Sequence, residues 1–218
     1  MRTVLLSGFE PFGGDAVNSS WEAVRHVAGT WDTDAEGAGL ATVRLPVTFG
    51  GAWPVLAAAV DEHVPDVVVA VGLAGATDAV RLERVAVNVA DARIPDNDGA
   101  QPVDEPLVAD GPAAYFSGLP VKAALAALRE ARIPAVVSNT AGTYVCNATF
   151  YALRHGLADR GVTAGFVHVP RTVEEDHHDA GALPVATLAE ALRIVARTAL
   201  AVAGGTLAEP VMAAGAEH

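Results

Sequence analysis

The sequence predicts an α/β protein, specifically a three-layer α/β/α sandwich with a central, largely parallel twisted sheet. Short apolar runs alternate along the chain with helical patterns, as expected when parallel strands are joined by helices. The run DVVVAV at 66–71 is almost entirely apolar, which is typical of a strand that is covered on both faces. A chain of 218 residues with 51% hydrophobic residues can bury a core of this kind.

The expected elements follow one another from the N-terminus. A strand at 3–7 leads into a loop at 8–14 that is rich in Gly and Phe. Asn18 precedes the first helix, at 21–27, and can cap it. Further strands are expected at 40–45, 66–71, 85–89, 135–138 and 162–169. Further helices are expected at 52–63, 121–131, 146–156 and 184–203.

The segment at 91–112 is rich in Pro, Asp and Gly and predicts a long loop. Long loops without regular structure are uncommon inside a compact domain and are often functional. No repeat or linker divides the chain, so we expect residues 1–205 to form a single α/β domain. The last residues, 206–218, are expected to form a frayed tail.

The composition limits the classes of partner. The net charge is −12, which repels phosphate backbones and anionic lipid headgroups, so we expect no nucleic-acid or membrane partner. A single cysteine excludes an intramolecular disulfide and a cysteine zinc cluster. No apolar run has the length of a bilayer span. We interpret the N-terminal apolar run as a strand because it is too short for a signal peptide, and expect a cytoplasmic protein.

The single cysteine, Cys146, lies where a loop ends and a helical pattern begins. At a helix N-terminus the unpaired backbone N–H groups and the helix dipole favour the thiolate, which is the reactive form of cysteine. The same N–H groups can bind the oxyanion that forms on a substrate carbonyl. Most lone cysteines are structural residues, so the position alone leaves both interpretations open.

Two further side chains can complete a nucleophilic site. His168 ends an apolar run just before Pro170, at the carboxyl edge of a strand, where ligands bind in open α/β sheets. Glu83 precedes another strand pattern, and a carboxylate can accept a hydrogen bond from an imidazole and fix its tautomer. Each has an ordinary alternative, which is a strand-end histidine for the first and an ion pair with Arg81 or Arg84 for the second.

The two loops add other candidates. Arg93 can donate to a carbonyl oxygen or to a developing oxyanion, and its alternative is an ion pair with a neighbouring aspartate. The loop at 8–14 lacks the Lys and Ser/Thr of a phosphate-binding loop, and its two phenylalanines suit a small apolar ligand. His177 and His178 lie among acidic residues whose spacing fits no metal-ligand face, so we interpret this segment as a solvated loop.

Four pairs of segments together resemble the pyroglutamyl peptidase type I family, cysteine peptidases that remove an N-terminal pyroglutamyl (5-oxoproline) residue from peptides. They occur in the order found in the family, and the segment around the cysteine is the most specific of them. They are GFEPFGG with NSSW at 8–14 and 18–21; GLAG with ERVAVN at 72–75 and 83–88; DARIPDN with QPVDEP at 91–97 and 101–106; and SNTAGTYVCN with FVHVP at 138–147 and 166–170.

The resemblance implies a role for each matching residue. Cys146 would be the nucleophile, His168 the general base and then the acid, and Glu83 the residue that orients His168. Arg93 and the backbone N–H of Cys146 would bind the oxyanion. The family's fold is an α/β/α sandwich that needs no cofactor or metal and is commonly a homotetramer. The lactam pocket would be lined by Phe9, Phe12, Ile94, Tyr144 and Val145.

Three residues depart from the family's pattern. Leu73 stands where many relatives have Gln, and Arg81 replaces a small hydroxyl residue two positions before Glu83. Arg171 occupies a position where an aromatic residue is common. Arg81 can pair with Glu83 and compete with His168 for it.

Three hypotheses follow for the function. The leading one is a cysteine omega-peptidase that acts on N-terminally pyroglutamylated peptides through a thioester acyl-enzyme. The second, suggested by Leu73 and Arg81, is another lactam or amide hydrolase on the same scaffold. The third is a small-molecule binder without catalysis, which need not keep the complete set of Cys146, His168 and Glu83.

Overall fold

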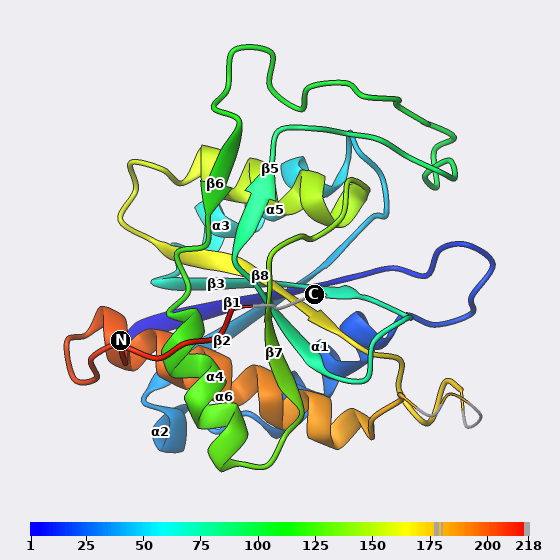
Figure 1. Cartoon of the computed structure of the whole chain (residues 1–218). Coiled ribbons are helices and arrows are strands. Elements are labelled where there is room, and N and C mark those ends of the chain that lie inside the picture. The colour runs from blue at the N-terminus through cyan, green and yellow to red at the C-terminus, as the bar shows by residue number, and fades with distance from the viewer. Residues whose placement is uncertain (177–178, 180, 216–218) are drawn as a thin grey trace.

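The computed structural model describes residues 1–176, 179 and 181–215. A six-stranded sheet with strand order β2-β1-β3-β8-β4-β7 forms the centre of the molecule (Figure 1). Its first four strands are parallel to one another, whereas β4 pairs antiparallel with β8 and parallel with β7. The strands are β1 (Arg2–Phe9), β2 (Ala38–Leu45), β3 (Val67–Leu73), β4 (Val80–Glu83), β7 (Ala135–Ser138) and β8 (Thr163–Val169).

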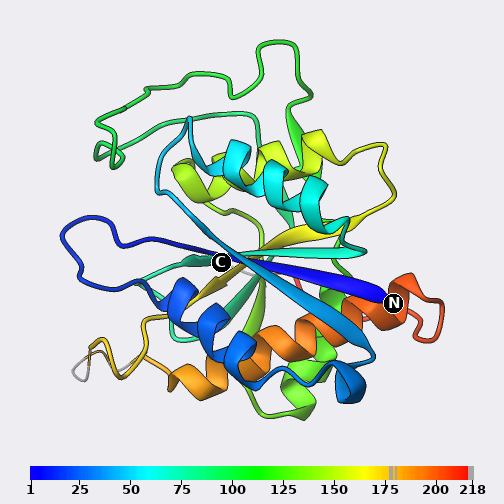
Figure 2. The ribbon, with the colours of Figure 1, turned by 180° about the vertical axis from the view of Figure 1, so that it is seen from behind.

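Helices cover both faces of the sheet, so the predicted three-layer sandwich is confirmed (Figures 1 and 2). One core cluster joins the sheet to α1, α4 and α6, and includes Leu82 and Val167. The other joins it to α3 and α5, and includes Phe166. Neighbouring residues of one strand therefore face opposite layers. The helices are α1 (Ser19–Thr30), α2 (Thr33–Glu36), α3 (Ala52–His63), α4 (Val121–Glu130), α5 (Val145–Gly156) and α6 (Val185–Ala203).

The predicted elements are present with shifts of no more than two or three residues at their ends, and the expected cap is confirmed. The side chain of Asn18 accepts a hydrogen bond from the backbone N–H of Ser20 at 3.0 Å, and α1 starts at Ser19. The bounds of α3 and β7 are those predicted. Every residue of β3 is buried, as its apolar sequence requires.

Three elements were not predicted: α2, β4 and β6 (Ala114–Phe116). The predicted strand at 85–89 is shorter, as β5 (Val85–Val87), and it lies outside the central sheet. It pairs with β6 in a two-stranded sheet of its own, which projects beside α5 (Figure 1). Between these two strands the chain has no helix or strand, as expected for a long loop.

The segment after α6 was expected to fray, and residues 206–215 have no helix or strand. They nevertheless contact the body of the protein. The Lys122 ammonium donates to the carbonyl of Met212 at 2.9 Å, and the Arg84 guanidinium donates to the carbonyl of Ala214 at 3.3 Å. Met212 and Ala214 also pack against the core cluster beneath α4 and α6.

None of the helices in the described part of the chain is both long enough and apolar enough to span a bilayer.

Candidate active site

The three residues expected to form a nucleophilic site come together from three elements. Glu83 is the last residue of β4, His168 is the penultimate residue of β8, and Cys146 is the second residue of α5. In the β4–β8 pair, His168 is opposite Arg81, so Glu83 and His168 project from the same face of the sheet. That face is the one covered by α5.

Glu83 and His168 form a buried hydrogen bond. The distance from His168 Nδ1 to Glu83 Oε1 is 2.8 Å, and the two residues are 6% and 0% exposed. Because Glu83 accepts from Nδ1, the other ring nitrogen, Nε2, remains available to Cys146. The ring of Phe166 packs against the His168 ring with centroids 4.9 Å apart. These contacts fix both the tautomer and the orientation of the imidazole.

The Cys146 thiol completes the arrangement and lies close enough to His168 to act on the pKa of its imidazole. Gly72 on β3 makes room for it, since a Cβ at this position would lie 2.9 Å from Cys146 Sγ and 2.8 Å from the Phe166 ring. The first backbone hydrogen bond of α5 runs from the N–H of Ala148 to the carbonyl of Tyr144. The N–H groups before Ala148 therefore have no partner within the helix and can bind an oxyanion.

The surroundings of His168 act on its pKa in opposite directions. Burial is the largest influence and lowers the pKa, because an imidazolium loses its hydration in the interior. The charge of Cys146 and its hydrogen bond raise the pKa, and the hydrogen bond and charge of Glu83 raise it further. The net effect raises the pKa of His168 from 6.5 to about 9. At neutral pH the site is therefore suited to hold His168 as an imidazolium beside Cys146.

A small apolar cavity adjoins the thiol. Its volume is about 10 Å³. Four residues from the predicted lactam pocket line it together with Cys146: Phe9, Phe12, Tyr144 and Val145. Three residues that were not predicted to line a pocket also do so: Asn18, Val47 and Leu73.

The two phenylalanines of this cavity pack against different rings. Phe9 is buried against Phe166, with ring centroids 6.3 Å apart. Phe12 instead faces Tyr144, also at 6.3 Å, and both rings are half-buried. One wall of the cavity is therefore part of the core, and the opposite wall belongs to side chains at the surface.

Arg93 and Ile94, the other two predicted substrate-binding residues, are both exposed, and neither lines this cavity. The segment that carries them is nevertheless anchored beside it. The Tyr144 hydroxyl donates to the carbonyl of Pro95 at 3.0 Å, and the Asp96 carboxylate accepts from the backbone N–H of Phe49 at 2.8 Å. Burial, followed by the charges of Asp96 and Cys146, raises the pKa of Tyr144, so this hydroxyl stays protonated.

Two polar residues that the sequence analysis did not single out join this segment to the loop after β1. The Asn97 amide donates to Glu10 Oε1 at 2.9 Å and to the carbonyl of Pro11 at 3.0 Å. Glu10 Oε1 also accepts from the backbone N–H of Val47 at 3.2 Å. Both residues lie inside the segments GFEPFGG and DARIPDN, so position in a motif was the only signal that marked them.

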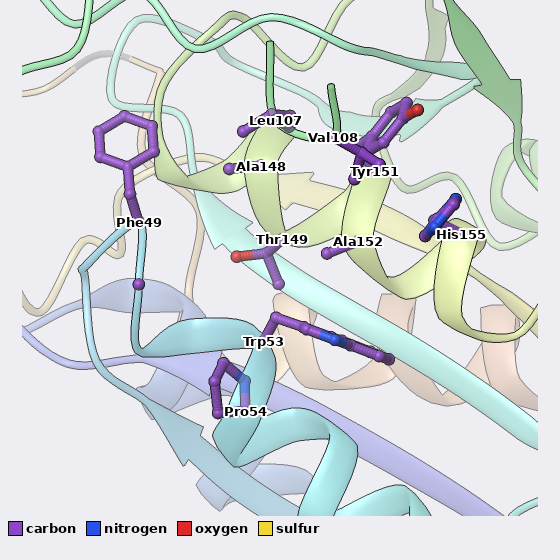
Figure 3. A pocket seen from close by; sticks show the side chains of 11 residues that line it. Phe49, Trp53, Pro54, Leu107, Val108, Ala148, Thr149, Tyr151, Ala152 and His155 are labelled. Carbon is purple, nitrogen blue, oxygen red and sulfur yellow. The ribbon is translucent and has the colours of Figure 1, made fainter. Parts of the chain in front are cut away.

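A larger cavity, of about 260 Å³, lies between α3 and α5 (Figure 3). Trp53 and Pro54 form its α3 side, and Tyr151 and His155 lie on its α5 side. None of Cys146, His168 and Glu83 lines it. This cavity is larger than the one beside Cys146, but the ionisable groups that can perform nucleophilic chemistry lie at the smaller one.

The departures from the family's pattern have distinct surroundings. Arg171 binds Asp15 at 3.0 Å and Glu175 at 2.8 Å, which links the loop after β8 to the loop after β1. Arg81 lies next to Glu83. His177 and His178 fall outside the described residues, and no group of three or more potential metal ligands occurs in the part that is described.

Comparison with known proteins identifies the family of this chain. The sequence profile of the family described as pyroglutamyl peptidase matches residues 2–202. The chain belongs to the pyroglutamyl peptidase family. The resemblance seen in the sequence motifs is therefore confirmed.

Members of the pyroglutamyl peptidase family resemble this chain over nearly its whole length. The pyrrolidone-carboxylate peptidase of Clavibacter michiganensis is 55% identical over 92% of this chain and 94% of the relative. That of Streptomyces coelicolor is 49% identical over 96% and 95%. The crystal structure of pyroglutamyl peptidase I from Bacillus amyloliquefaciens has a TM-score of 0.86 at 41% identity, covering 92% of this chain and 98% of that one.

The fold of the pyroglutamyl peptidase family is also preserved at lower identity. The pyrrolidone carboxyl peptidase of Thermococcus litoralis is 32% identical and has a TM-score of 0.91 over 98% of this chain and 100% of that one. The central sheet and its covering helices are thus a shared property of the family.

Proposed function

We propose that this chain hydrolyses the amide bond that follows an N-terminal pyroglutamyl residue of a peptide. Cys146 is the nucleophile, His168 the proton carrier and Glu83 the residue that orients His168. One observation carries the proposal: Glu83 is hydrogen-bonded to His168, and Cys146 lies beside His168 at the start of α5, in a chain of the pyroglutamyl peptidase family. The geometry matches the general pattern of nucleophile, base and orienting group.

The reaction then proceeds through a thioester. The Cys146 thiolate attacks the carbonyl carbon of the pyroglutamyl residue, and the negative charge moves to the carbonyl oxygen. The unpaired N–H groups at the start of α5 bind this oxyanion, and Arg93 adds a charged donor. As the C–N bond breaks, His168 donates its proton to the leaving amine. A water molecule then gives a proton to His168 and attacks the thioester, which releases pyroglutamate and restores the thiolate.

The apolar cavity beside Cys146 fits the chemistry of the ring. A pyroglutamyl residue has no free amine and no charge, so it favours an apolar slot with a few backbone hydrogen bonds over a carboxylate. At about 10 Å³ the cavity holds no more than about one water molecule. Substrate binding therefore requires side chains to move, and the half-buried pair Phe12 and Tyr144 is the wall that can do so. The same movement brings the exposed segment with Arg93 and Ile94 to the substrate.

A panel of chromogenic amides tests the proposal. Pyroglutamyl amide should be hydrolysed at least about 100-fold faster, in kcat/KM, than the prolyl and acetyl amides, because a site built for a lactam leaves unpaired polar groups when the lactam oxygen is missing. Equal or faster hydrolysis of the prolyl or acetyl amide would instead favour another amide hydrolase on this scaffold. No hydrolysis of any amide, with tight binding of pyroglutamate, would favour a binding protein.

We also propose that the chain assembles into a homotetramer, as its resemblance to the family implies. The two-stranded sheet supports this, because Phe116 on β6 is 71% exposed and an aromatic ring of this kind is common at interfaces between subunits. Light scattering on the purified chain should give the mass of four copies, and a monomer mass at working concentrations would contradict the assembly.

A further inference from the structure

Arg81 lies beside the Glu83–His168 pair, and the mechanism above gives it no role. In the antiparallel register of β4 and β8, Arg81 is directly opposite His168. Residues in this relation share one face of the sheet, with Cβ atoms about 4.5–5.5 Å apart. Arg81 Nε is 3.8 Å from Glu83 Oε1, the same oxygen that accepts the hydrogen bond from His168. A permanent cation and the imidazole therefore share one carboxylate oxygen.

The guanidinium of Arg81 is held in this position from a third strand. Its Nη2 donates to Ser138 Oγ on β7 at 3.1 Å, and Ser138 Oγ in turn donates to the carbonyl of Thr140 at 3.0 Å. The other oxygen of Glu83, Oε2, is buried and has no hydrogen-bond partner among the described residues. Arg81 and His168 therefore both contact the Glu83 carboxylate at the same oxygen, Oε1.

Solvent reaches Arg81 from the side away from His168. The Arg81 side chain is 35% exposed and lines a cavity of about 450 Å³ between the edge strand β7 and α4. Ser138 and Arg129 line the same cavity. Salt in solution can therefore screen the charge of Arg81, whereas Glu83 is fully buried.

We propose that Arg81 is a positioning residue of this chain. Its charge is held beside Glu83 Oε1 and favours proton loss from the pair of Cys146 and His168. It therefore lowers the pH at which the pair is active. The proposal rests on the cysteine peptidase chemistry proposed above. Arg81 takes no part in the hydrogen bond between Glu83 and His168, which the two side chains make directly.

Few other charged groups in the described chain face the pair. From α5 there is Cys146 itself, and from the loop before α5 there is Tyr144, whose charged neighbour is Asp96. β3 contributes Gly72 and Leu73, which are uncharged. Arg171, after β8, is engaged by two carboxylates of its own. Arg81 is therefore the cation in the best position to act on the pair.

The effect has a definite sign. A positive charge near a group that binds protons makes proton loss easier, so replacing Arg81 with a neutral residue should move the proton losses of the pair to higher pH. For a cation at this distance that is partly exposed to water, we expect a shift of about 0.5–1 pH unit. Arg81→Lys keeps the charge and should shift the profile by less than about 0.3 unit.

The rate of alkylation of Cys146 by iodoacetamide measures this shift without any substrate, because the chain has a single cysteine. The rate is followed against pH by intact mass in the wild type, Arg81→Leu, Arg81→Lys and Ser138→Ala. We expect the largest rise of the midpoint in Arg81→Leu. Ser138→Ala is the matched control: it removes one hydrogen bond that holds the guanidinium and leaves the charge in place, so its midpoint should rise less. The pH profile of kcat/KM for a pyroglutamyl amide should shift in the same direction.

An unchanged midpoint in Arg81→Leu would overturn the proposal, and so would an equal shift in Ser138→Ala, which would assign the effect to the Ser138 hydrogen bond and not to the charge. If Arg81→Leu does not fold, the wild type alone decides. Its midpoint should rise as salt approaches about 1 M, where the screening length falls to about 3 Å, and a midpoint independent of salt would contradict the role of Arg81. Failure of the proposed function is distinguishable, because it would abolish hydrolysis and leave the alkylation result standing.

Discussion

The two sides of the candidate active site are built in different ways. Glu83 and His168 lie on strands of the central sheet, are buried, and bond at 2.8 Å. On the other side, Arg93 and Ile94 lie in an exposed segment without helix or strand. Side chains on buried strands are fixed by packing, whereas loop residues are fixed only by the few hydrogen bonds that anchor the loop.

This difference separates the chemistry from the selection of substrate. Glu83 and His168 are already hydrogen-bonded without a substrate, but the cavity proposed for the pyroglutamyl ring has a volume of only about 10 Å³. We therefore expect substitutions on the sheet side to lower kcat, and substitutions on the loop side to raise KM. The Arg81 experiment belongs to the sheet side, because Arg81 acts on the protonation of the pair.

The largest effect should come from Cys146→Ala. Removing the nucleophile leaves only substrate binding and oxyanion stabilisation, so kcat/KM for a pyroglutamyl amide should fall by at least about 10,000-fold. The free energy of unfolding should change by less than about 1 kcal/mol, since only one partly exposed sulfur atom is removed. Denaturant unfolding of the same preparation is the control. A variant that keeps more than about one hundredth of the activity would exclude Cys146 as the nucleophile.

The next effect should come from Glu83→Gln, which keeps the shape of the side chain and removes its charge. We expect kcat/KM to fall by about 100- to 10,000-fold, because the tautomer of His168 is no longer fixed. Since the hydrogen bond and charge of Glu83 both raise the pKa of His168, their loss lowers it from about 9. The imidazolium is then lost at lower pH, and the alkaline limb of the profile moves down.

This shift is opposite in sign to the one expected for Arg81→Leu, so the two variants are controls for each other. The pH dependence of kcat/KM measures both. The same sign of shift in both variants would show that the profile does not report the charge around His168. In the wild type the rate should fall as pH rises through about 9, where His168 loses its proton.

The sheet side was the more predictable from sequence, with one instructive exception. Cys146 was expected at the start of a helix, and α5 begins at Val145. The sequence could predict this because the helical pattern begins directly after a loop. β4 was missed although it carries Glu83. Its sequence VRLE is short and half polar, since Arg81 and Glu83 face the site while Val80 and Leu82 face the core. A search for apolar runs overlooks a strand whose second face serves the chemistry.

The position of the loop side could not be predicted from the sequence. The motif DARIPDN gave the identity of the residues, and its composition correctly predicted a loop. Neither could place Arg93 and Ile94, because the course of such a loop depends on anchors that are distant in sequence. The anchors here are the contacts of Pro95 with Tyr144 and of Asp96 with Phe49. A single sequence has no periodic pattern that would reveal contacts between residues so far apart in the chain.

The smallest effect should come from Asn97→Ala, which loosens the loop side alone. The Asn97 amide holds the segment against Glu10 and the carbonyl of Pro11, and both bonds are exposed to solvent. Two exposed hydrogen bonds contribute about 1–2 kcal/mol together, so KM should rise by about five- to thirtyfold. The pair of Cys146 and His168 lies on the other side, and kcat should stay within about twofold.

The adjacent Asp98→Ala is the matched control, because the side chain of Asp98 takes part in neither bond to the loop after β1. It should leave both KM and kcat unchanged within about twofold. A loss in kcat as large as the rise in KM for Asn97→Ala would mean that the loop positions the reacting groups as well as the ring. The division between a fixed sheet side and an adaptable loop side would then fail, because the anchors of Arg93 would act on the same step as Glu83.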